Sequence, residues 1–437
     1  MGNPATPGVK IARQYLRQTL KILYITPEYP LPNPSGGIAG YLRDIARETA
    51  RRGHEVKIIC QDEAYAGEGA VHIDFDEGVE IHYVSKSLMG TLAKVLETPR
   101  LRRLFRFAIP DLVPLIPPLT AFCYWRRLRR QWRPDIIETF DWKATGLLFA
   151  LFEGGIPVVF RGGGHCKALI PYNDLPWNHF FESQHRLERW TARASTLLVP
   201  CSELLGEDEA RDFQIPKEKI LPVPNCVSLI RTGDPGGDPS GRGTTKVAFV
   251  GRLELRKGID LLVKAAERLY VKYPEVDYYL VGRIDKDPFQ FLNTKGPGRG
   301  VREKIHLTGP IPRDKVYDTL AGCDFAVFPS RYEPFGNVAL EAMACGLPVI
   351  VSDRGGWREA VEDGETGFVC RAGDVDSLRE AMERMILLSR EKRVDMGRRG
   401  RERVVRDYSA RAVADRMIAI YEKLTPGGST TYKGMGP

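Results

Sequence analysis

The segment EPFGNVALEAMACGLPVIVSDRGG, at residues 333–356, gives the clearest indication of how this chain folds. It follows the apolar run DFAVFP (324–329) and contains a second one, LPVIVS (347–352), with a helical pattern that starts near Gly336 and Asn337 between them. Two buried strands joined by a helix form a right-handed crossover unit of a parallel sheet. The segment therefore predicts an α/β layer whose helix starts at the carboxyl ends of the strands.

The same alternation recurs on both sides of a stretch at 227–245 that is rich in Gly, Pro, Ser and Asp and is interpreted as a linker. Further strands are expected after it at 246–251, 277–282, 304–309 and 366–370, and before it at 21–26, 55–60, 79–84, 135–138, 157–160, 195–200 and 219–224. We therefore expect an α/β chain of two facing Rossmann-like domains with parallel sheets.

The expected domain boundaries follow from this pattern. They are a leader at 1–18, an N-terminal domain at 19–226, the linker at 227–245, a C-terminal domain at 246–407, a helix at 408–424 that packs back on the N-terminal domain, and a disordered tail at 425–437.

The composition is that of an ordinary globular protein. Of 437 residues, 43% are hydrophobic and 27% are charged, which excludes collagen-like, disordered and disulfide-rich miniprotein classes. Eight cysteines are scattered singly with no Cys-x-x-Cys pair, so we expect a reducing, cytoplasmic compartment. The first 18 residues lack the apolar core of a signal peptide.

The positive charge is concentrated in one segment. The net charge is +8, and between Lys86 and Arg133 eleven basic residues stand against two acidic ones. Prolines in the apolar run at 108–125 argue against a membrane span. Two interpretations of 86–133 stay open: peripheral docking on an anionic membrane surface at the inner face of the cell membrane, or amphipathic helices packed on the sheet. No nucleic-acid partner is expected, because no groove-reading module is visible.

Two glutamates flank the start of the helix in the decisive segment. Glu333 precedes Phe335, Gly336 and Asn337, and Glu341 lies one turn into the helix. Free backbone N–H groups at a helix start bind anions, and carboxylates on either side can accept hydrogen bonds from the hydroxyls of a nucleotide sugar. The alternative is a capping acid and a solvated helix glutamate.

Two cations follow the first strand of the second domain, in the sequence GRLELRKGID (251–260). Arg252 and Lys257 there would lie at the carboxyl end of the sheet, where ligands bind in open α/β folds. They would stabilise the negative charge of a departing nucleoside diphosphate, unless they are ordinary surface cations. The glycine-rich loop PSGGIAG (34–40) suits a phosphate but is not the G-x-G-x-x-G dinucleotide fingerprint, so an NAD-dependent enzyme is not expected.

Taken together, SGGIAGYLRDIARETARRGHEV, the pattern from Gly251 to Ile259 and EPFGNVALEAMACGLPVI with GGWREAVEDGETGFV resemble the family 4 retaining glycosyltransferases (glycosyl transferases group 1). The resemblance implies a GT-B fold with the active-site cleft between the two domains. It also implies these roles: Glu341 holds the ribose; Glu333, Phe335, Gly336 and Asn337 contact the donor sugar and phosphates; Arg252 and Lys257 bind the diphosphate; Gly36 and Gly37 lie beside it. Backbone groups near Pro310 and Ile311 would read the base.

One part of the chain departs from the family pattern. Where the family commonly has Arg-x-His, this chain has RGGGHCKAL, so that Gly163 occupies the expected place of the histidine. His165 either takes over a catalytic role beside the donor sugar through a shifted loop or is an ordinary loop histidine. Arg161 and the glycines after it suit an anion-facing turn. The hinge PNCVS (224–228) also differs from the family's usual Pro-Asn-Gly-Val-Asp.

The function expected from these features is transfer of a sugar, with retention of configuration, from a nucleoside-diphosphate sugar to a glycan, lipid-linked or small-molecule acceptor. Among the possible donors, a UDP-sugar is favoured. The catalytic candidates are Arg252, Lys257, Glu333 and His165. No cofactor and no metal ion are expected to be required, because no Asp-x-Asp site is apparent. The alternatives are a nucleotide-sugar-binding regulator without turnover, or a GT-B sugar-nucleotide epimerase or phosphorylase.

Overall fold

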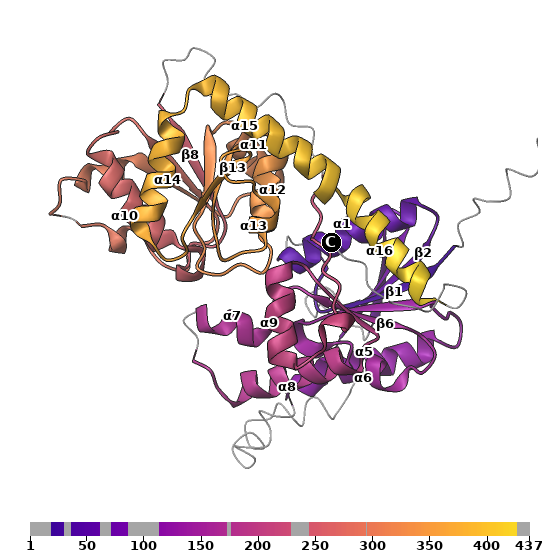
Figure 1. Cartoon of the computed structure of the whole chain (residues 1–437). Coiled ribbons are helices and arrows are strands. Elements are labelled where there is room, and N and C mark those ends of the chain that lie inside the picture. The colour runs from indigo at the N-terminus through magenta and orange to yellow at the C-terminus, as the bar shows by residue number, and fades with distance from the viewer. Residues whose placement is uncertain are drawn as a thin grey trace, which may run out of the picture.

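The computed structural model describes residues 19–29, 36–61, 71–85, 113–172, 176–228, 244–293 and 295–425. They form two α/β domains joined by the hinge before the linker and by a long C-terminal helix (Figure 1). The expected leader, most of the expected linker, the first part of the basic segment (86–112) and all but the first residue of the expected tail lie outside the described residues.

The N-terminal domain is built on a seven-stranded sheet in the order β3-β4-β2-β1-β5-β6-β7. Its strands are β1 (Lys21–Thr26), β2 (Glu55–Cys60), β3 (Val71–Asp76), β4 (Val79–Val84), β5 (Ile136–Phe140), β6 (Val158–Gly162) and β7 (Leu197–Pro200). All neighbouring strands are parallel except β3 and β4, which are antiparallel. The sequence did not predict β3, because its apolar side chains Ile73 and Phe75 are exposed and leave no buried face to recognise.

One expected strand is absent. Residues 219–224 are irregular and make a single bridge between Ile220 and Leu198. The backbone N–H groups of Leu221 and Val223 donate to the carbonyl oxygens of Leu198 and Pro200 at 2.8 and 3.0 Å, so the segment runs beside β7. Pro222 and Pro224 have no N–H to donate to a further strand, so the segment serves as a connection at the edge of the sheet.

The C-terminal domain contains a six-stranded parallel sheet in the order β10-β9-β8-β11-β12-β13. Its strands are β8 (Lys246–Val250), β9 (Asp277–Val281), β10 (Ile305–Gly309), β11 (Phe325–Phe328), β12 (Val349–Ser352) and β13 (Gly367–Cys370). Each of the six overlaps a strand expected from the sequence. Because β8 and β11 are neighbours, the loops that follow them meet at the same edge of the sheet.

Helices cover the sheets of both domains (Figure 1). In the first half of the chain they are α1 (Gly37–Arg51), α5 (Ile116–Leu128), α6 (Leu147–Phe152), α7 (Cys166–Leu169), α8 (His179–Ala194) and α9 (Glu203–Phe213). In the second half they are α10 (Ile259–Tyr270), α11 (Arg313–Ala321), α12 (Asn337–Ala344), α13 (Trp357–Ala360), α14 (Val375–Leu387), α15 (Arg390–Arg403) and α16 (Ala410–Leu424).

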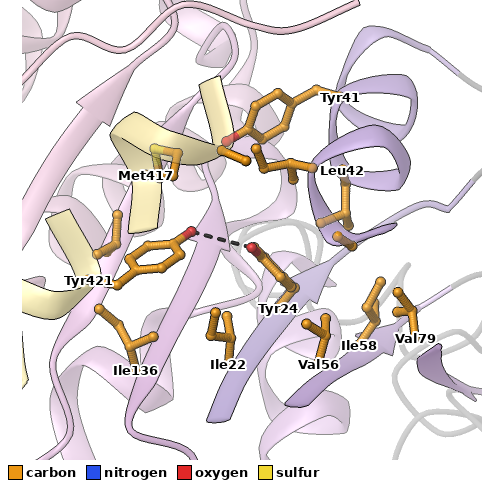
Figure 2. Packing of buried hydrophobic residues seen from close by; sticks show 14 of the residues in the cluster. Ile22, Tyr24, Tyr41, Leu42, Val56, Ile58, Val79, Ile136, Met417 and Tyr421 are labelled. Carbon is orange, nitrogen blue, oxygen red and sulfur yellow. Dashed lines mark hydrogen bonds between the residues drawn. The ribbon is translucent and has the colours of Figure 1, made fainter. Parts of the chain in front are cut away.

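The last helix, α16, returns to the N-terminal domain and packs beside α1 (Figure 1). Its side chains Met417 and Tyr421 are fully buried in the same hydrophobic cluster as Ile22 and Tyr24 of β1 (Figure 2). The hydroxyl oxygens of Tyr421 and Tyr24 lie 3.4 Å apart and share a hydrogen bond. The C-terminal end of the described chain therefore belongs to the core of the first domain.

The two domains also touch directly along one side. The Ser202 hydroxyl donates a hydrogen bond of 2.7 Å to the carbonyl oxygen of Pro334, and the Tyr332 hydroxyl donates one of 2.9 Å to Asp208. The rings of Tyr332 and Tyr172 stack with their centroids 5.2 Å apart. These contacts hold the segment at 332–334 of the C-terminal domain against the N-terminal domain.

Candidate active site

A cleft of about 460 Å³ lies between the two domains. Gly37, Trp142 and Gly164 line it from the N-terminal domain, and Lys257 and Glu333 from the C-terminal domain. It opens where the carboxyl ends of β8 and β11 meet the start of α1, which is the usual position of a ligand site in open parallel sheets.

A cationic cluster surrounds Glu333 in this cleft. The Nζ atom of Lys257 lies 2.5 Å from Oε2 of Glu333, and Nη1 of Arg256 lies 3.3 Å from the same oxygen. Arg252 also lines the cleft, but its side chain is half-exposed and lies 3.1 Å from Glu254. The structure thus brings together three of the predicted residues, Arg252, Lys257 and Glu333, from loops that follow neighbouring strands.

The charges of this cluster are set by burial and by each other. Burial alone would raise the pKa of Glu333, but Lys257 and Arg256 outweigh it and lower that pKa below its ordinary value. Burial lowers the pKa of Lys257, and Glu333 opposes that shift. Glu333 is therefore ionised at neutral pH and fixes both cations in place, and it is not protonated for use as a general acid.

Two helix N-termini face each other across the cleft. Residues Gly37 of α1 and Asn337 of α12 are the first of their helices, and neither helix has a side chain bonded to its first N–H groups. The Nδ2 atom of Asn337 donates a hydrogen bond of 3.3 Å to the carbonyl oxygen of Gly37. Free N–H groups and two converging helix dipoles suit an anion such as a phosphate.

The entry to α12 depends on a glycine. Gly336 has φ +95° and ψ +60°, a left-handed conformation that side chains disfavour, and a Cβ there would overlap the ring of Trp357. Phe335, just before it, is buried and its ring lies 6.1 Å from that of Tyr408, so only part of this residue borders the cleft. Gly36 is exposed beside the cleft, one residue before α1.

Glu341 and Ile311 do not border the cleft as the structure defines it. Oε1 of Glu341 accepts a hydrogen bond of 2.7 Å from Arg313, and burial raises the pKa of Glu341 against the effect of that arginine. Ile311 is half-buried against the hydrophobic core of the C-terminal domain. Both lie on the α11–α12 side of the site, so the ribose and base contacts expected of them stay predictions.

His165 does not lie where the sequence analysis expected a catalytic histidine. Its side chain is completely buried, its Nε2 lies 3.0 Å from Asp212, and its ring centroid lies 4.8 Å from that of Phe213. The chain turns at Gly164, whose φ is +130°, and the next side chain points into the domain. Of the two roles left open for His165, a completely buried side chain that does not line the cleft fits an ordinary histidine and not a group beside the donor sugar.

Backbone groups of the glycine loop occupy the cleft wall instead. The N–H groups of Gly163 and Gly164 donate hydrogen bonds of 2.9 and 2.6 Å to Oδ2 of Asp141. A Cβ on Gly164 would lie 2.7 Å from the ring of Pro334 in the other domain. The two domains approach each other so closely here that the loop has no room for a side chain at Gly164.

Arg161 ties this loop to the hinge. Its guanidinium is buried and donates hydrogen bonds to the carbonyl oxygen of Val223 at 2.7 Å and to Oδ1 of Asn225 at 2.8 Å. It also lies 4.3 Å from the ring centroid of Tyr41. Arg161 borders the cleft, as an anion-facing residue should, but most of its donors are used to hold the hinge.

Arg256 and Asn225 are among the cleft residues that could not be identified from the sequence. Arg256 is next to Lys257 in the sequence, and only the structure shows that both reach Glu333. Asn225 donates a hydrogen bond of 3.1 Å from Nδ2 to Oδ1 of Asn337 across the domain boundary. The hinge motif contained Asn225, but nothing in the sequence pairs it with a residue 112 positions away.

The described part of the basic segment is α5 and the residues after it. Trp125 and Ala121 are fully buried, so this part of the apolar run packs on the sheet, as one of the two interpretations expected. Arg126, Arg127 and Arg130 are exposed, and α5 packs against α6, whose side chains Leu151 and Phe152 are also exposed. Across the described ranges, no helix has both the length and the apolar character needed to cross a membrane.

Two family models match the chain, one on each domain. The glycosyl transferase 4-like domain matches residues 36–226, and the glycosyl transferases group 1 model matches residues 239–403. Together they cover most of the chain and meet near the hinge.

Individual relatives have low sequence identity to this chain, but the matches span nearly the full length of both proteins. Glycogen synthase of Mycobacterium tuberculosis is 26% identical over 410 residues, which span 92% of this chain and 94% of the relative. Sucrose-phosphate synthase from Thermosynechococcus elongatus has the same fold, with a TM-score of 0.66 and 21% identity over 92% of this chain and 99% of the other. Anabaena Alr3699/HepE, solved in complex with UDP, has a TM-score of 0.63 and 18% identity over the same shares.

Proposed function

This chain belongs to the glycosyl transferases of group 1 and has the GT-B fold, and from this premise we propose that it moves a hexosyl group from a UDP-sugar to an acceptor with retention of configuration. The observation that carries the proposal is the cationic cluster of Lys257 and Arg256 around Glu333, which lies beside two helix N-termini.

This cluster supplies what the reaction needs at the leaving group. As the bond between the anomeric carbon and the diphosphate oxygen breaks, the electron pair stays on the diphosphate and its negative charge grows. Lys257, Arg256 and Arg252 offer fixed positive charge, and the N-termini of α1 and α12 add oriented N–H groups. We therefore propose that turnover needs no added divalent ion.

UDP is proposed as the nucleotide because a protein of the same fold was solved in complex with UDP. Retention is implied by the resemblance to family 4. The ribose would lie toward Glu341 and Arg313, beyond the start of α12, and the sugar would lie between Glu333 and the N-terminal domain. This arrangement extends from the cleft toward Glu341 and leaves the acceptor to approach along Trp142, which lines the cleft from the N-terminal domain.

The acceptor is proposed to be a glycan, a lipid-linked sugar or a small molecule. The exposed arginines at the end of α5 and just after it, together with the exposed side chains of Leu151 and Phe152 on α6, suit an anionic membrane surface, which would serve a lipid-linked acceptor.

The proposed function is tested first by a thermal-shift panel of UDP-, GDP-, ADP- and dTDP-sugars, since a ligand at about 100 times its Kd adds roughly 2.7 kcal/mol of stability. The donor found in this way is then incubated with the protein, and release of the nucleoside diphosphate and the anomer of the liberated sugar are followed by NMR. Release of UDP together with a sugar that has the same anomeric configuration as the donor supports the proposal. Inversion, or binding of another base, contradicts it.

A nucleotide-sugar-binding protein without turnover is the second candidate. The observation that favours it is that no histidine is present among the described residues that line the cleft. Binding of the donor at full affinity, with no release of UDP in the presence or absence of acceptors, would favour this candidate over the transferase.

A further inference from the structure

A compact group of potential metal ligands lies inside the N-terminal domain, behind the glycine loop. It consists of Cys166 at the start of α7 and His185 and Glu188 of α8. One ligand atom of each lies within 4.8 Å of the other two, and all three residues are buried. None of them borders the donor cleft, so the group is not part of the site described above.

The distances suit a small ion. Oε2 of Glu188 lies 3.1 Å from Sγ of Cys166 and 4.0 Å from Nδ1 of His185. In a tetrahedral zinc site, with metal–ligand bonds of about 2.0 to 2.3 Å, neighbouring ligand atoms are about 3.3 to 3.8 Å apart. The Cys166–Glu188 distance is slightly shorter than this spacing and the His185–Glu188 distance slightly longer, so these two pairs need only small shifts, and the third pair lies within 4.8 Å.

A second observation points to a ligand. Nδ1 of His185 is buried and has no hydrogen-bond partner, although it faces Glu188. Its ring is fixed by packing, with centroids 5.6 Å from the ring of Phe213 and 5.9 Å from that of His165. A buried ring nitrogen without a partner is costly, and a bound cation would satisfy it.

We propose that Cys166, His185 and Glu188 bind a transition-metal ion of the zinc type. Thiolate and imidazole together favour Zn²⁺ over Mg²⁺ or Ca²⁺, which prefer oxygen ligands alone. The carbonyl oxygen of Phe181 on α8 accepts a hydrogen bond of 3.6 Å from Sγ of Cys166 and is a further oxygen beside the group.

The ion would have a structural role. It links α8 to the first residue of α7, which comes two positions after Gly164 of the cleft wall. Without the ion, packing and hydrogen bonds hold this junction: the backbone N–H and the thiol of Cys166 donate to Oε2 of Glu188 over 3.2 and 3.1 Å, and Gln184 donates to Oε1 over 3.3 Å. The ion would therefore fix the position of the glycine loop.

The first test measures metal on the full chain. The purified protein is stripped with a chelator, dialysed, and titrated with Co²⁺ and with Zn²⁺. We expect one equivalent to bind, with the absorption of a thiolate-to-cobalt charge transfer that Zn²⁺ then abolishes. Binding of less than one equivalent, or cobalt binding without the thiolate band, would overturn the proposal.

The second test uses matched cysteine variants. Cys166→Ser should weaken zinc binding by about 100-fold or more, because loss of a ligand costs at least as much as loss of its supporting contacts. Cys370→Ser removes an equally buried thiol from the other domain and should bind zinc as the wild type does. If Cys166→Ser does not fold, His185→Gln takes its place. Equal zinc affinity in all variants rules the site out, whatever the outcome for sugar transfer.

Discussion

Asn337 of the C-terminal domain donates a hydrogen bond from Nδ2 to the carbonyl oxygen of Gly37 in the N-terminal domain, over 3.3 Å. Its Oδ1 accepts another from Nδ2 of Asn225, at the hinge, over 3.1 Å. One side chain thus joins the starts of two helices and the hinge. The proposed phosphate site is therefore assembled from both domains, and its geometry depends on how closely they approach.

The first prediction concerns this link. Asn337→Ala removes two hydrogen bonds between the domains, each contributing about 1 kcal/mol, so the KM for the donor should rise by roughly 5- to 30-fold. Initial rates of UDP release across donor concentrations measure it. Asn293→Ala, at an exposed position of the C-terminal domain that does not line the cleft, is the control. An unchanged KM in Asn337→Ala would show that the link has no role in donor binding.

The second prediction separates the two glutamates. Glu341→Gln should weaken both UDP and the UDP-sugar by about 1.5 to 3 kcal/mol, because the ribose loses a charged acceptor. Glu333→Gln should weaken only the UDP-sugar, since Lys257 and Arg256, which lie beside Glu333, keep their positive charge for the diphosphate. Calorimetry with both ligands measures the pattern. Wild-type affinities in both variants would mean that neither glutamate contacts the donor.

The third prediction concerns pH and the buried Glu138. Burial raises its pKa to about 7, although Arg161 and a hydrogen bond donated by Tyr421 oppose the shift. Because the folded-state pKa lies above the unfolded value, this group stabilises the fold fully below about pH 4.5 and loses that contribution as the pH rises through 7. The lost free energy of unfolding is about 3 kcal/mol.

Glu138→Gln should remove this part of the pH dependence. Urea unfolding at pH values from 5 to 8 gives the free energy of unfolding of both proteins. The value for the wild type minus the value for the variant should fall as the pH rises. Parallel pH profiles for the two proteins would contradict the shift assigned to Glu138.

The fourth prediction concerns membranes. Replacing Arg126, Arg127 and Arg130 by alanine should weaken binding to vesicles of anionic phospholipid by about 3 kcal/mol at low salt, at about 1 kcal/mol per cation, while donor hydrolysis is unchanged. Arg129 is kept because it pairs with Glu153 over 2.8 Å. The control replaces three exposed cations of the other domain, Arg283, Lys315 and Arg398. The docking proposal fails if the wild type does not sediment with such vesicles.

The strands of both sheets could be predicted where both of their faces are buried. β1 and β12 are continuous apolar runs between polar loops, and such runs are recognisable without any partner. β3 has its apolar side chains on the outside and pairs antiparallel at an edge, so its sequence carries no sign of burial.

The donor cleft could be predicted in part, because the topology of the sheet places Lys257 and Glu333 together once β8 and β11 are neighbours. The directions in which the side chains point could not be predicted from the sequence. His165 points inward because of the backbone turn at Gly164, and no residue pattern reports a φ angle. Cys166 and His185 likewise come together only through the packing of α7 on α8.

The most direct test of the account is the rate of UDP release by Lys257→Ala, compared with the wild type and with Lys264→Ala, an exposed lysine on α10. Since the charge on the diphosphate is greatest in the transition state, kcat should fall by about 100-fold or more while affinity for the donor falls less than about 10-fold. Lys264→Ala should match the wild type. A raised KM with kcat unchanged in Lys257→Ala would contradict the role of the cationic cluster in the departure of the leaving group.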